Sequence, residues 1–242
     1  MCYAVVIGGI KEMSTPLHKL PVVAARWART NETPEEIAQM TTKFINELSP
    51  EIDISEWGKP NGIRKVDANS IANYIKETDR LDDMSSPELD GYRLTLGVYD
   101  TPSTTDLLTN LNINAGAAEI PRLIPSPSAM QTFYNSEWNG IKKLGMCSMT
   151  AMITAFDPVV VSFHDAELNL CDPRRDSWAV PLGYYVWIND LIGPIKSFAP
   201  GLQVTHLKNG TLITVPDEWP AEIVAESLLE TYSQNNIRDI PR

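Results

Sequence analysis

The stretch Leu-Leu-Thr-Asn-Leu-Asn-Ile-Asn-Ala at residues 107–115 decides the fold class of this chain. Asn110, Asn112 and Asn114 fall between residues that are apolar, apart from one threonine. In an extended chain, alternate residues point to opposite faces, so the apolar and amide side chains separate. The period of two therefore predicts a half-buried strand.

Further strands and helices are expected on both sides of this segment. Apolar runs predict strands at 22–27, 92–99, 159–163 and 184–188, and Asn209-Gly210 predicts a hairpin between 203–208 and 211–215. Capping residues and helical spacing predict helices at 33–48, 67–76, 136–156 and 219–234, and residues 58–62 are expected to form a loop. Because there is no steady βαβ alternation, we expect an α+β fold with a largely antiparallel or mixed sheet packed by helices.

The length of 242 residues suits one large domain. Pro121, Pro125 and Pro127 exclude a central strand or a helix at residues 120–128, which makes this stretch a candidate seam between two halves. We assign residues 1–20 to an N-terminal extension, 21–236 to the main domain and 237–242 to a tail.

Composition and charge exclude several classes of protein. The chain is 43% hydrophobic and 21% charged, which excludes a largely disordered chain, a collagen-like repeat and a polytopic membrane protein. The net charge of -11 argues against direct nucleic-acid binding, although it allows a basic protein partner. We expect no membrane partner, because no apolar run approaches the roughly 18 to 20 residues of a membrane span.

The three cysteines, Cys2, Cys147 and Cys171, lack the spacing of a metal site or a disulfide framework. We expect free thiols and residence in the cytoplasm. The N-terminus has no basic region before its apolar residues, so no secretory signal is expected.

The densest group of reactive side chains surrounds His164, Asp165 and Cys171. These residues could form a nucleophilic site or a metal site. A turn that carries a polar histidine and two solvated acids, Asp165 and Glu167, explains the sequence equally well. The acidic residues Asp82, Asp83, Asp90 and Asp100 lack calcium-loop spacing and are expected in solvated loops. Since the familiar catalytic signatures are missing, we expect no enzyme, metal or cofactor.

Several stretches match one family in the same order along the chain. They are Ala25 to Arg29, Trp57-Gly58-Lys59, Gly91 to Gly97, Asp157 to His164 and Asn209 to Val215 followed by an acidic helix. Over about residues 21–236 the chain resembles the immunity protein 52 family of bacterial polymorphic toxin systems. The chain departs from that family at Ala28, where a glycine is usual, and at Tyr99-Asp100, where a tryptophan is usual.

The resemblance implies a protein that neutralises a toxin encoded beside it in the producing cell. The usual toxin is a restriction-endonuclease-like nuclease, often exported by type VI secretion. The family supplies no catalytic residues, which agrees with the missing signatures.

Two acidic groups are candidate toxin-binding residues. Glu222, Glu226 and Glu230 repeat every four residues along the predicted last helix, and no Lys or Arg lies between Asp217 and Ile237. The second group is Glu77, Asp79, Asp82 and Asp83. Acidic residues on an ordinary solvated surface would give the same sequence pattern. The alternative functions are a small hydrolase or metal-dependent enzyme centred on His164, Asp165 and Cys171, and a scaffold without a toxin partner.

Overall fold

The computed structural model describes most of the chain. It covers residues 20–48, 57–59, 62–63, 67–79, 91–99, 107–118, 127–134, 138–174, 176 and 178–241. The predictions for residues 1–19 and for Asp82, Asp83, Asp90 and Asp100 lie outside these residues, and so do residues 120–126 of the expected seam. Among the described residues, no helix combines the length and hydrophobicity needed to cross a membrane.

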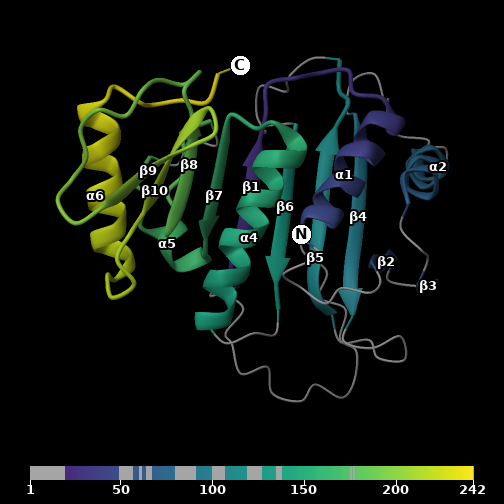
Figure 1. The fold of residues 1–242 in the computed structure, drawn as a ribbon, viewed down its shortest axis with the longest axis horizontal. Coiled ribbons are helices and arrows are strands. Elements are labelled where there is room, and N and C mark those ends of the chain that lie inside the picture. The colour runs from purple at the N-terminus through teal and green to yellow at the C-terminus, as the bar shows by residue number, and fades with distance from the viewer. Residues whose placement is uncertain are drawn as a thin grey trace.

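A single antiparallel sheet forms the centre of the molecule (Figure 1). Within the described residues it has ten strands in the order β3-β2-β4-β5-β6-β1-β7-β8-β10-β9, and every neighbouring pair is antiparallel. The strands are β1 (Val22–Arg26), β2 (Trp57–Lys59), β3 (Gly62–Ile63), β4 (Tyr92–Tyr99), β5 (Leu107–Ala115), β6 (Ser128–Phe133), β7 (Val160–His164), β8 (Tyr185–Asn189), β9 (Gln203–Leu207) and β10 (Gly210–Thr214). The predicted α+β class is confirmed.

The helices are α1 (Pro34–Leu48), α2 (Ala68–Asp79), α4 (Trp138–Phe156), α5 (Ala166–Leu170) and α6 (Ala221–Gln234). In Figure 1, α1 and α4 lie in front of the sheet and α6 lies at its left end. The expected capping box of α1 is present: Glu36 N donates to Thr33 Oγ1 at 3.2 Å, and Thr33 N donates to Glu36 Oε2 at 2.8 Å.

Helices cover both faces of the central strands. Side chains that alternate along β7 belong to different cores: Val161 and Phe163 pack with α1 and α4, whereas Val160 packs with α6. The α1–α4 core includes Trp27 stacked on Phe156, with ring centroids 5.2 Å apart. The α6 core is formed by β7, β8 and β10 together with Val224, Leu228 and Tyr232 of the helix. Helix α6 therefore packs against the sheet through the apolar face of the helix.

A buried carboxylate fastens the end of β1. Glu32 is almost fully buried, and its Oε1 accepts a hydrogen bond from Trp27 Nε1 at 2.7 Å. Its Oε2 accepts from the backbone N of Gly116, which follows β5, at 2.9 Å. Gly116 has φ +87°, and a Cβ there would lie 2.5 Å from the carbonyl oxygen of Glu32, so only glycine suits this position.

The structure adds four elements that the sequence did not predict: β6, α5, β2 and β3. Strand β6 begins at Ser128, the last residue of the stretch from which a central strand was excluded, and it lies between β5 and β1 in the sheet, so that exclusion is wrong at Ser128. The short helix α5 replaces the expected turn after His164. The segment expected to be a loop at residues 58–62 contributes to the two short strands β2 and β3.

The segment assigned to a tail also has structure. Ile237 and Ile240 are buried in the α6 core, and Asp239 forms an isolated bridge with Ala179.

Candidate functional site

His164 ends the central strand β7 and lies half-buried on the sheet. Its Nδ1 is hydrogen-bonded to Ser162 Oγ at 3.0 Å, and Ser162 itself is fully buried. Burial lowers the pKa of His164 to about 4, and the positive charge of Arg26 adds to this effect. The imidazole is therefore neutral near pH 7.

Asp165 caps a helix, and it is not the solvated acid that the sequence suggested. It is only 5% exposed, and its Oδ1 accepts a hydrogen bond from Leu168 N, in the first turn of α5, at 2.9 Å. Tyr184 Oη donates to the same carboxylate at 3.3 Å. Burial and this carboxylate raise the pKa of Tyr184 far above its ordinary value, so the phenol stays protonated near neutrality and keeps this hydrogen bond.

Cys171 closes α5 at its C-terminal end. Its Sγ donates to the carbonyl oxygen of Glu167 at 3.4 Å, and it does not form a disulfide. Burial raises the pKa of the thiol, and the charges of Glu222, Glu167 and Asp165 raise it further. A thiol with a raised pKa is a poor nucleophile, because only the thiolate attacks.

These three residues therefore have separate local partners. His164 is bonded to Ser162, Asp165 accepts from α5 and Tyr184, and Cys171 donates to Glu167. Within the described part of the chain, no three His, Cys, Asp or Glu side chains group as metal ligands.

The acidic row of α6 lies on the outer face of that helix. We use this name for Glu222, Glu226 and Glu230, all of which are exposed. Among the described residues, none of the three carboxylates forms an ion pair; Glu230 Oε1 accepts from Gln234 Nε2 at 2.9 Å. Ile223, on the same outer face, is 41% exposed. The row thus combines unneutralised negative charge with an apolar side chain.

The second acidic group is only partly within the described residues. Glu77 is exposed in the last turn of α2, and Asp79 ends that helix. Asp82 and Asp83 lie outside the described residues. The structure therefore places only the beginning of this group.

Polar contacts fasten the C-terminal half of α6 and its capping residue to two neighbouring connections, one before β8 and one after it. Asn235 Oδ1 accepts from the backbone N of Lys196 at 2.7 Å, and Thr231 Oγ1 accepts from Ala199 N at 3.0 Å. Tyr232 Oη donates to the carbonyl oxygen of Pro181 at 2.8 Å. These bonds fix the position of α6 and therefore of the acidic row on its outer face.

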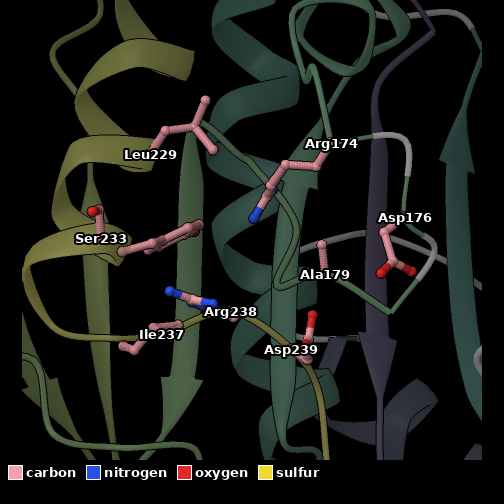
Figure 2. A pocket seen from close by; sticks show the side chains of 9 residues that line it. Arg174, Asp176, Ala179, Leu229, Ser233, Ile237, Arg238 and Asp239 are labelled. Carbon is pink, nitrogen blue, oxygen red and sulfur yellow. The ribbon is translucent and has the colours of Figure 1, made fainter.

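A pocket of about 440 Å³ opens beside the same half of α6 (Figure 2). Leu229, Tyr232 and Ser233 line it from the helix. Opposite them lie Asp176, Ala179 and Asp239, and the lining is completed by Arg174, Ile237 and Arg238.

Backbone bonds hold the pocket wall in place. Val180 N donates to the carbonyl oxygen of Arg238 at 3.0 Å, and Ile240 N donates to that of Trp178 at 2.8 Å. Sequence reasoning missed this pocket because it treated residues 237–242 as a tail. The two isoleucines at positions 237 and 240 were the available signal that this segment packs against the domain.

The comparisons with known proteins give a likeness to solved structures. No protein-family model and no curated protein matches the chain, so membership of the immunity protein 52 family stays a prediction. The solved structure of the Pseudomonas aeruginosa T6SS protein PA0821 is similar, with a TM-score of 0.50 and 11% identity. The match covers 91% of this chain and 76% of that chain. At this identity the likeness shows the fold alone.

Proposed function

We propose that this protein is an immunity protein that binds a cognate secreted toxin and neutralises it in the producing cell. The likeness to a T6SS protein supports a connection to type VI secretion. The sequence resemblance described above supports the inhibitory role and a nuclease of the restriction-endonuclease type as the partner.

The observation that carries this proposal is the acidic row of α6. Like charges four residues apart on a helix cost a few tenths of a kcal/mol for each pair, and no ion pair among the described residues relieves them. A basic partner would remove this repulsion on binding. Ile223 would supply apolar contact within the same surface.

A nuclease is a suitable partner on electrostatic grounds. Its substrate is a polyanion, so its active cleft is expected to be basic. A protein with a net charge of -11 is attracted to such a cleft and can cover it. The proposed action is direct protein binding without catalysis.

The enzyme alternative receives no support from the contacts of His164, Asp165 and Cys171. The thiol is held protonated and is bonded to a backbone carbonyl, and the carboxylate caps a helix. We therefore propose that these residues have structural roles in α5 and its surroundings.

Co-purification with the toxin encoded by the neighbouring reading frame tests the proposal. A tag on the toxin should retain this protein, and the complex should degrade DNA much more slowly than the free toxin. Absence of a complex, or equal nuclease activity with and without this protein, would contradict the proposal.

A further inference from the structure

The pocket beside α6 borders the acidic row. Glu226, Leu229 and Ser233 are spaced by three and four residues, so they share one face of the helix. Glu226 thus lies one turn before Leu229 and two turns before Ser233, both of which line the pocket. A partner bound to the acidic row would reach the pocket along the same face.

The charges at the pocket are mixed, and one of them is neutralised internally. Arg174 Nε donates to Asp172 Oδ1 at 2.9 Å and its Nη2 donates to Asp172 Oδ2 at 2.6 Å. The same guanidinium lies over the Tyr232 ring, 5.8 Å from its centroid. Such a two-point pair leaves little net charge for a ligand to meet.

The remaining charges favour a cation. Asp176 and Asp239 line the pocket without forming an ion pair among the described residues, and Glu226 stands beside it. Among the described lining residues, Arg238 is the positive charge that remains once Arg174 is paired with Asp172. The last turn of α6 carries no basic residue, so its partial negative charge is uncompensated there. An anion would meet an unfavourable balance at this place.

The walls suit a long side chain with a charged end. Leu229, Ile237, Ala179 and the Tyr232 ring provide apolar surface, and the two aspartates lie on the wall opposite the helix (Figure 2). Arginine and lysine bury an aliphatic stem while their charged head stays at polar groups.

We propose that this pocket receives one arginine or lysine side chain of the toxin. The stem packs on Leu229 and Ile237, and the charged head meets Asp176 and Asp239. This inference rests on the proposed function and identifies an anchor point within its interface.

Methyl NMR titrations with N-acetyl-arginine amide test the pocket without the toxin. The methyl groups of Leu229, Ile237 and Ala179 report on binding. N-acetyl-citrulline amide has nearly the same shape but no charge, and it should bind at least about fivefold more weakly, the factor that corresponds to 1 kcal/mol. Equal binding of the two probes, or no methyl shift at saturating arginine probe, would overturn the inference.

Charge variants then separate a cation site from an anion site. Asp176→Asn with Asp239→Asn should weaken binding of the arginine probe, and the change at position 176 keeps the side-chain oxygen that accepts from Trp178 N. Arg238→Gln should strengthen binding of the arginine probe, because this substitution removes the opposing positive charge. Asp157→Asn, at an exposed residue outside the pocket lining, is the matched control and should change nothing. Weaker binding by Arg238→Gln, or tighter binding of N-acetyl-glutamate amide than of the arginine probe, would overturn the cation assignment.

The proposed function and the proposed role of the pocket can be contradicted independently of each other. If the toxin complex forms but the pocket takes no arginine probe, the immunity role stands and the anchor is wrong. If no complex forms although the probe binds, the immunity role is wrong and the pocket remains a cation site.

Discussion

At the scale of single residues, the proposed lack of catalysis makes a direct prediction for His164 and Cys171. The double variant His164→Ala with Cys171→Ala should protect cells from the toxin as well as the natural protein, because we propose that these side chains, bonded to Ser162 and to the Glu167 carbonyl, have structural roles. Protection is measured by co-expression with the toxin, and thermal unfolding checks that the variant folds. Lost protection by a folded variant that still binds the toxin would contradict the prediction.

The buried surroundings of His164 predict a pH dependence of stability. Its pKa is about 4 in the folded protein, against 6.5 as the ordinary value, so the unfolded chain binds the proton more readily. Stability from this group is present above pH 6.5 and is lost as the pH falls toward 4. The loss is at most about 3 kcal/mol, from 1.36 kcal/mol per pKa unit.

Urea unfolding at a series of pH values from neutral down to the folded-state pKa measures this effect. The variant His164→Gln should show a smaller fall in the free energy of unfolding over this range than the natural protein. His206→Gln, at an exposed residue of β9, is the control and should retain the full fall. Identical pH profiles for His164→Gln and the natural protein would assign the dependence to other groups.

At the scale of elements, the acidic row of α6 should control the rate of association with the toxin. Exposed charges at the edge of an interface act mainly on the association rate and its salt dependence. Changing Glu222, Glu226 and Glu230 to Gln removes the charges with little change in helix propensity. Association at low salt should slow by about tenfold or more, and the difference should shrink near 0.5 M salt, where the screening length is about 4 to 5 Å.

Stopped-flow kinetics measure these rates. The control variant carries Glu47→Gln, Asp157→Asn and Asp190→Asn, which change the net charge equally at exposed positions outside α6. It should slow association much less than the α6 variant. Equal slowing by both variants would mean that only the net charge matters, and an unchanged rate for the α6 variant would exclude this helix from the interface.

Most elements could be predicted from sequence because each carries its own pattern. Strand β5 shows a clean period of two, and α1 begins with a capping box that the structure reproduces. Strand β6 was missed because Gln131 stands at a fully buried position, where an apolar residue would be expected. Its Nε2 donates to Thr109 Oγ1 at 3.2 Å on β5, a partner that sequence alone does not reveal.

The candidate site was only partly predictable for a similar reason. The exposed acidic row follows from helical spacing, which is local. The cap at Asp165 belongs to a five-residue helix that is too short to show periodicity. The pocket depends on pairing between residues near 179 and 239, which are distant in sequence.

At the scale of the whole molecule, the cysteines should all be free thiols. Cys147 and Cys171 form no disulfide, whereas Cys2 lies outside the described residues. Unfolding without reductant should therefore expose three thiols to a maleimide reagent, counted by intact mass. A count below three in freshly prepared protein would contradict this prediction.

The central place of β1 has a consequence for synthesis on the ribosome. Strand β1 pairs with β6 on one side and with β7 on the other, although β7 begins more than half the length of the chain later. At roughly 5 to 20 residues per second, β7 leaves the ribosome about 7 to 28 seconds after β1. During that interval one edge of β1 lacks its partner strand, so the two halves of the sheet can join at β1 and β7 only after more than half of the chain has been made.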